Sequence, residues 1–64
     1  MQLSINKINL EMARKGYNIA KLAEFYGVSY QRMRTILNSR KVSIATVGKL
    51  AEALGVDVTE IIED

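Results

Sequence analysis

Apolar residues recur at helical spacing along the chain, and strict alternation of apolar and polar residues is absent. Five residues of the types that cap helix N-termini each follow an apolar or aromatic residue, and each has another apolar residue four positions later. The five candidate caps are Ser4, Asn18, Ser29, Ser43 and Asp57. The apolar pairs around them are Leu3/Ile8, Tyr17/Leu22, Val28/Met33, Val42/Val47 and Val56/Ile61. The pattern therefore predicts five helix starts.

Helix ends follow from a second set of residues. Gly16, Gly27 and Gly55 each fall just before a candidate cap, where a residue in the left-handed conformation commonly ends the preceding helix. Asn38 and Ser39 close the third helix. Together the signals predict an all-α fold with helices over residues 5–15, 19–26, 30–38, 44–54 and 58–63.

Composition limits the classes of function. We predict a single domain over residues 1–64, in which 48% apolar residues suffice for a core. The absence of Cys and His removes disulfides, thiolate zinc sites and the usual imidazole base or metal ligand. No apolar run is long enough for a membrane span or a signal peptide. The prediction is a small cytoplasmic binding module with no enzymatic activity, metal, cofactor or small-molecule ligand.

The charges are distributed unevenly. The net charge is only +2, but residues 1–49 hold all nine basic residues and two acidic ones, a net +7. Residues 50–64 hold five acidic residues and no basic one, a net −5. The basic part predicts a polyanion-binding surface, with the acidic end facing away from the polyanion. An ordinary solvated surface is the alternative.

The segment from Ile19 to Asn38 contains two short helices separated by a turn of about three residues. Ala23, a small residue, lies four positions before Gly27, where the two helices would cross closely. This arrangement is typical of a helix-turn-helix, whose second helix enters the major groove of DNA. It places a DNA-reading helix over residues 30–38.

The motifs KLAEFYGVS, ILNSRK and LAEALGVDVTEII, in this order, resemble the lambda-repressor-like Cro/cI-type (XRE) family of DNA-binding domains. The resemblance extends from about Ile8 to Ile62. It implies a compact five-helix lambda-repressor-like bundle with a helix-turn-helix over about residues 19–38, and double-stranded DNA as the partner. Members often pair an Arg in the first helix with a Glu at the end of the third, where this chain has Met12 and Leu37. Many members open the second helix with Gln, where this chain has Ile19.

A helical projection of residues 30–38 separates the core from the DNA-reading side. Apolar residues cluster on one side, and Gln31, Thr35 and Asn38 lie opposite. Gln suits adenine, Arg suits guanine, and the Thr methyl group suits thymine. The predicted base contacts are Tyr30, Gln31, Arg34 and Thr35. Tyr30 either stacks on sugar or thymine or packs on its own helix.

Polar and basic residues around the two helices are predicted to contact phosphates or the flanks of the site. They are Asn18, Lys21, Arg32, Asn38, Ser39, Arg40, Lys41 and Ser43. The alternative for the basic members is a solvated face that binds nothing.

One recognition helix covers about half of an operator, so we expect a homodimer, at least on DNA. Four apolar residues near the end of the sequence are candidate dimer contacts, namely Val56, Val58, Ile61 and Ile62. The alternative is that all four complete the core.

The resemblance implies a transcriptional regulator, and we expect a repressor of phage or mobile-element type that occupies a two-fold operator. Such a protein would lie in the cytoplasm, associated with the nucleoid when bound. One alternative is an antitoxin-type autorepressor that also binds a toxin protein. Another is a helix-turn-helix used only for protein interaction, which the two Arg residues and absent acids of the recognition helix disfavour.

Overall fold

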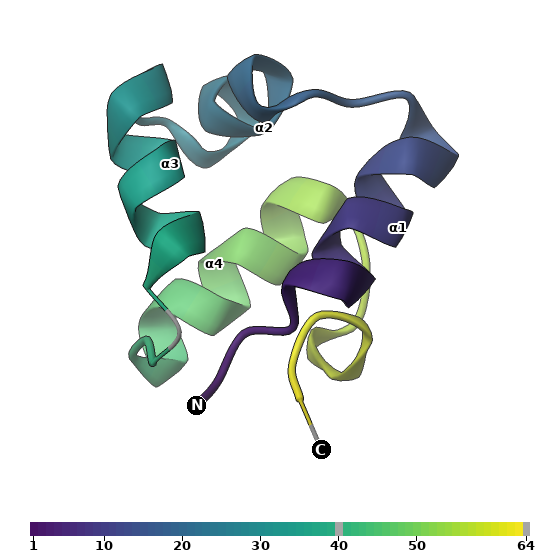
Figure 1. Cartoon of the computed structure of the whole chain (residues 1–64), viewed down its shortest axis with the longest axis vertical. Helices are drawn as coiled ribbons and strands as arrows, with labels where there is room; N and C mark the ends of the chain where they lie inside the picture. Colours follow the sequence, from purple (N-terminus) through teal and green to yellow (C-terminus); the bar gives the residue numbers. More distant parts are fainter. Residues whose placement is uncertain (40, 64) are drawn as a thin grey trace.

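The structure is a computed structural model that describes residues 1–39 and 41–63. In these residues the chain forms four α-helices and one turn of 3-10 helix (Figure 1). The elements are α1 (Ile5–Lys15), α2 (Ile19–Tyr26), α3 (Tyr30–Asn38), α4 (Ile44–Leu54) and η1 (Val58–Glu60). The first four helices have the bounds that the sequence predicts. No helix within the described ranges is long and apolar enough to span a membrane.

All five predicted N-caps are confirmed. Each cap residue has extended backbone dihedrals, and its side-chain oxygen accepts a hydrogen bond from a backbone N–H in the first turn. The apolar residue four positions after each cap is at most 1% exposed; these residues are Ile8, Leu22, Met33, Val47 and Ile61. The caps therefore set where each helix begins and also which residue enters the core.

Glycine is required at the end of α2, where the chain turns sharply into α3. Gly27 has a φ of 93°, a left-handed conformation that side chains strain. Its backbone N–H donates to the carbonyl of Ala23 at 2.8 Å. The close approach between α2 and α3 thus depends on the small Ala23 and on Gly27 as the C-cap, as the sequence predicts.

The prediction of a fifth helix over residues 58–63 is wrong. Asp57 does cap the segment, but only a single 3-10 turn follows, and the chain leaves it at Ile61. The residues involved include Val58, Thr59, Ile61 and Ile62, and these β-branched types have low helix propensity. Backbone groups that a helix would use are bound elsewhere: the Ile61 carbonyl accepts from Ser4 N at 2.8 Å.

The partner of this C-terminal segment is the start of the chain. Residues Met1–Ser4 run between Lys41–Val42 on one side and Ile61–Glu63 on the other, and we call these three segments the seam. Met1 and Val42 exchange two backbone hydrogen bonds of 3.0 and 2.9 Å. On the other side, Glu63 N donates to the Gln2 carbonyl at 3.0 Å. In Figure 1 the purple segment that opens the chain lies next to the yellow C-terminal segment.

The core lies between the helices and the seam. α2 packs against α3 and α4, and both α1 and α4 contact η1. The most completely buried large side chains of the core come from all four α-helices and from the seam; they are Leu3, Ile8, Leu22, Met33, Val47, Leu50, Leu54 and Ile61. Helix α3 is therefore held by one continuous apolar core.

Candidate nucleic-acid interface

Helix α3 has one buried side and one exposed side. Met33, Ile36 and Leu37 are at most 9% exposed and face the core, as the helical projection predicts. The residues on the opposite side are exposed. Ser29 holds the start of the helix by accepting a hydrogen bond from Arg32 N at 3.1 Å. The result is a rigid helix that presents polar side chains outward.

The four predicted base-contacting residues, Tyr30, Gln31, Arg34 and Thr35, are all exposed on α3. The Arg34 guanidinium carbon lies 6.0 Å from the centroid of the Tyr30 ring, so the ring attracts the cation and orients it along the helix. The Thr35 hydroxyl donates to the Gln31 carbonyl at 3.1 Å. Because that hydroxyl is bound within the helix, the methyl group is the part of Thr35 suited to a base. Tyr30 is 47% exposed and so keeps much of its ring outside the core.

Several predicted phosphate contacts already have roles in capping. Asn18 Oδ1 accepts from Lys21 N at 2.8 Å, which leaves the side-chain amide N–H groups to donate to a phosphate. Ser43 Oγ accepts from Thr46 N at 3.2 Å. The Ser39 hydroxyl donates to the Thr35 carbonyl at 3.0 Å.

The basic and amide residues among the predicted phosphate contacts lie on different elements. Arg32, Asn38 and Lys41 are exposed around α3 and the segment that follows it. Lys21 lies on α2 with its ammonium nitrogen 5.3 Å from the centroid of the Phe25 ring. Arg40 lies outside the described residues. The assignment of all these residues to phosphates stays a prediction.

A feature that sequence reasoning missed is a small hollow between α1 and α3. It measures about 150 Å³, and its polar lining comes from Asn9, Arg34 and Asn38. Ile5 and Ile19 lie at the same hollow, and Ile5 is 40% exposed. The first helix therefore borders the recognition helix. The signal for this hollow in the sequence was the polar Asn9 directly after Ile8, the apolar residue paired with the first cap.

The four candidate dimer contacts are partly used within the chain. Ile61 is completely buried and leaves no surface for a second chain. Val56, Val58 and Ile62 are half-buried and pack against the core. Core completion thus accounts for Ile61, and any dimer contact here would involve the exposed parts of the other three residues.

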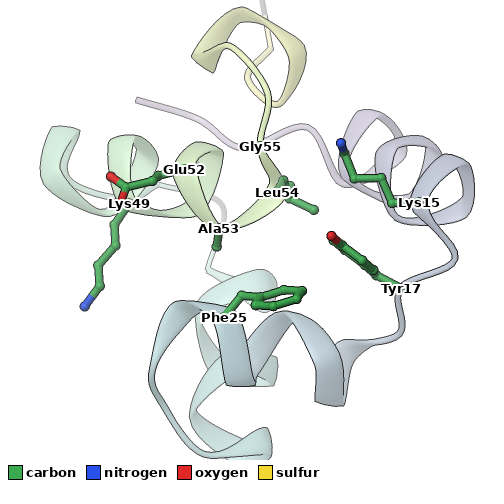
Figure 2. A pocket seen from close by; sticks show the side chains of 8 residues that line it. All are labelled: Lys15, Tyr17, Phe25, Lys49, Glu52, Ala53, Leu54 and Gly55. Carbon is green, nitrogen blue, oxygen red and sulfur yellow. The ribbon is translucent and has the colours of Figure 1, made fainter.

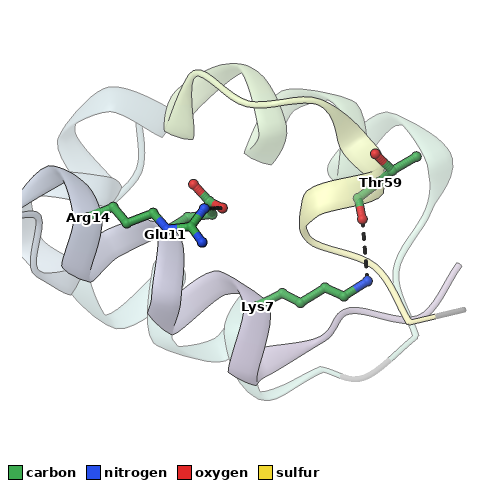
Figure 3. A network of polar contacts seen from close by, with 4 residues as sticks. All are labelled: Lys7, Glu11, Arg14 and Thr59. Atoms are coloured by element: carbon green, nitrogen blue, oxygen red, sulfur yellow. Dashed lines mark hydrogen bonds and ion pairs between the residues drawn. The ribbon is translucent and has the colours of Figure 1, made fainter.

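Charged residues of α1 form hydrogen bonds and an ion pair within the chain. The ammonium group of Lys7 donates to the Thr59 carbonyl at 3.5 Å (Figure 3). It also donates to the Ile62 carbonyl at 3.0 Å. Glu11 is only 6% exposed, and its carboxylate accepts from the Arg14 guanidinium at 2.9 Å. Lys7 and its two acceptors join α1 to the C-terminal segment. Part of the basic charge is therefore structural.

Acidic side chains in the described residues do not gather into a metal site of three or more ligands. Asp57 caps η1 through its carboxyl group, which accepts two hydrogen bonds from Thr59. The Thr59 backbone N–H at 3.0 Å and the Thr59 hydroxyl at 2.8 Å donate to it and lower its pKa below the ordinary 3.8.

A family model described as a Cro/C1-type HTH DNA-binding domain matches residues 7–64. No curated protein and no solved structure matches. The matched range contains α2, α3 and α4 in full, together with η1.

Proposed function

Because the chain belongs to the Cro/C1-type HTH family of DNA-binding domains, we propose that it represses transcription by occupying a two-fold operator. The observation that carries the proposal is the two-sided recognition helix. Its apolar side is buried, while Gln31, Arg34 and Thr35 stand exposed on a helix capped by Ser29. Such a helix offers base-reading groups at a fixed orientation, which specific recognition requires.

In the proposed complex, the N-terminal half of α3 lies in the major groove. Gln31 pairs with an adenine through its amide, and Arg34 pairs with a guanine. Arg34 approaches its base along the Tyr30 ring that orients it. Thr35 places its methyl group against a thymine methyl. Specificity thus comes from residues spaced along one exposed side of α3.

Phosphates on either side of the groove fix the register of α3. On one side Asn18 donates from the start of α2, and on the other Lys41 reaches from the segment between α3 and α4. Arg32, Asn38, Ser39 and Ser43 are exposed nearby and add neutralising or hydrogen-bonding groups. These contacts supply affinity without sequence preference.

A second protomer completes the proposed operator complex. The two protomers bind half-sites about one helical turn apart, and the exposed parts of Val56, Val58 and Ile62 meet across the two-fold axis. These side chains are apolar and only partly buried, which supports this contact. The proposed place of action is the cytoplasm, on the nucleoid.

An antitoxin-type autorepressor that also binds a second protein is the other candidate. One observation favours it. Large apolar side chains are exposed away from α3, among them Leu10 at 57% and Phe25 at 48%. Operator binding through α3 gives these side chains no role.

Selection of binding sites from random duplex DNA tests the proposed function. The expected result is enrichment of a short sequence repeated with two-fold symmetry, with half-sites about 10 base pairs apart. A double variant, Gln31→Ala with Arg34→Ala, serves as the control and should enrich no sequence. Failure of the unaltered chain to enrich any sequence contradicts the proposal. Enrichment of a single unrepeated half-site contradicts the dimer.

A further inference from the structure

A second surface of the molecule has a composition suited to binding. A hollow of about 370 Å³ lies between the end of α1, one side of α2 and the second half of α4 (Figure 2). Tyr17 and Phe25 form its aromatic wall, and Leu54 and Ala53 form its aliphatic part. Lys15 and Lys49 also line it.

The aromatic wall is partly open to water. The Tyr17 and Phe25 ring centroids are 5.2 Å apart at an interplanar angle of 53°, a packed aromatic pair. Phe25 nevertheless remains 48% exposed. Leu54, by contrast, is buried and belongs to the core. An apolar side chain from outside would therefore meet both rings and gain the burial that Phe25 lacks.

Lys15 and Lys49 line the hollow, and Lys21 lies beside Phe25 outside it. The ammonium nitrogen of Lys21 lies 5.3 Å from the Phe25 centroid, and that of Lys49 lies 4.7 Å from the Tyr26 centroid. Lys15 extends toward Gly55 at the end of α4, within 3.6 Å of the position that a Cβ atom would take there. Glu52 is the acidic residue among those that line the hollow. Two lysines and one glutamate line the hollow, which gives its lining a net charge of +1.

This surface does not belong to the recognition side. The residues that line the hollow come from α1, α2, α4 and the turns between them, and none comes from α3. Tyr30 and Arg34 instead border hollows shared with Asn9 and Ile19. DNA bound along α3 would leave Phe25, Lys15 and Lys49 uncovered, because none of them is a predicted DNA contact.

We propose that this hollow binds a short acidic segment of a partner protein, which inserts one apolar side chain against Tyr17 and Phe25. The lysines attract the acidic residues, and the aromatic wall accepts the apolar one. The shape favours a polypeptide over a small molecule, because a wall half exposed to water would leave much of a small ligand uncovered. The inference is independent of the proposed operator function.

Titration of the isotope-labelled chain with a synthetic peptide, followed by NMR, tests the inference. The probe is a seven-residue peptide with a central tryptophan and three glutamates on each side, and its counterpart carries lysines in place of the glutamates. Shifts at Tyr17, Phe25 and Ala53 are expected with the acidic peptide alone. Absence of shifts up to 5 millimolar peptide, taken as roughly the weakest affinity of interest, would overturn the proposal. Shifts centred on α3 would do the same, because the peptide would then occupy the DNA side.

Two variants separate the hollow from the rest of the surface. Phe25→Ala should weaken the acidic peptide about tenfold or more, whereas Leu10→Ala, which removes an equally exposed apolar side chain outside this hollow, should leave its affinity unchanged. Circular dichroism establishes that both variants fold. Equal effects of the two variants would refute the site.

Charge reversal distinguishes a protein partner from nucleic acid. Lys49→Glu should weaken the acidic peptide and leave binding to a 20-base-pair duplex unchanged. Loss of duplex binding in this variant would identify the hollow as a nucleic-acid surface. Shifts at Phe25 that grow with protein concentration alone would identify a second copy of the chain as the occupant. Either result would overturn the proposal.

Discussion

The helix-turn-helix and the seam are built in opposite ways. In the helix-turn-helix, α2 and α3 pack against each other within twenty residues of sequence, and Ser29 and Gly27 fix their junction through local hydrogen bonds. In the seam, backbone groups of Met1–Ser4 bind Val42, Ile61 and Glu63, which lie far away in the sequence. One region is specified by nearby side chains, the other by distant backbone groups.

The two regions meet beside the candidate interface. Lys41, a predicted phosphate contact, forms an antiparallel bridge with Gln2. Val42, the next residue, exchanges its two backbone hydrogen bonds with Met1. The segment that leads from the recognition helix into α4 is therefore held from the seam side. Five substitutions test this comparison. We expect changes in and beside the seam to affect stability and phosphate contacts, and changes in the helix-turn-helix to affect base recognition and the capping of α3.

The largest effect is expected for Ile61→Ala in the seam. Ile61 is completely buried, so truncation should lower the free energy of unfolding by about 2–5 kcal/mol. Chemical denaturation measures the change. Ile44→Ala is the matched control, because the same side chain is 77% exposed there and its removal should cost under about 0.5 kcal/mol. Similar costs at both positions would contradict the burial of the seam.

Gln31→Ala should separate recognition from stability. Loss of the amide should weaken binding to the preferred duplex by about 1–3 kcal/mol and relax the base preference at one position. Binding titrations on the selected site and on single-base variants measure both. Gln2→Ala, at an exposed glutamine of the seam, should retain the base preference. A Gln31→Ala variant with unchanged preference would exclude this residue from base reading.

Ser29→Ala tests the cap between α2 and α3. It removes the acceptor for Arg32 N and should lower the free energy of unfolding by about 0.5–2 kcal/mol. Ser39→Ala is the control, because its hydroxyl donates to a carbonyl at the other end of α3. Thermal unfolding compares the two. If Ser39→Ala proved the more destabilising, local capping would not be what holds α3.

Lys41→Ala tests the phosphate contact beside the seam. Affinity for all duplexes should fall alike, and the slope of log affinity against log salt should decrease by about one. Lys49→Ala, on the other side of the molecule, should leave that slope unchanged. Titrations at several salt concentrations supply the slopes. An unaltered slope in Lys41→Ala would remove this residue from the interface.

The smallest effect concerns Asp57, which caps η1 next to the seam. Its pKa is lowered in the folded chain, so its contribution to stability is present above the ordinary value of 3.8 and is lost as pH falls through the folded-state pKa. Asp57→Asn should therefore flatten the decline of unfolding free energy below about pH 4. Thr59→Val removes the hydroxyl donor alone and should give an intermediate slope. Denaturation at a series of pH values measures the slopes, and identical slopes in all three proteins would contradict this account.

The sequence predicted what nearby side chains determine. Every cap, four helices and the buried side of α3 follow from residues within one or two turns of each other. The prediction of a helix over residues 58–63 failed because Asp57 signals only where a helix begins. The β-branched residues after it and the hydrogen bond from the distant Ser4 to Ile61 decide where the chain leaves it.

For the candidate site, too, features within one helix followed from the sequence, and contacts between helices did not. The exposure of Gln31 and Thr35 followed from the position of the apolar residues on α3. The cation–π contact between Arg34 and Tyr30 also lies within that helix, at a spacing of four residues. The approach of Asn9 to Arg34 was not predicted, because it depends on how α1 packs across the bundle.

The seam also bears on the order in which the chain folds. It closes the molecule into a ring by joining Met1 to Val42 and Ser4 to Ile61, and closure of such long loops costs more entropy than formation of a helical turn. We therefore expect the ring to close after the helices have met, late on the folding pathway. Changes in Met1–Ser4 would accordingly speed unfolding while leaving the folding rate nearly unchanged. The first residues of the chain would govern how long the native state lasts.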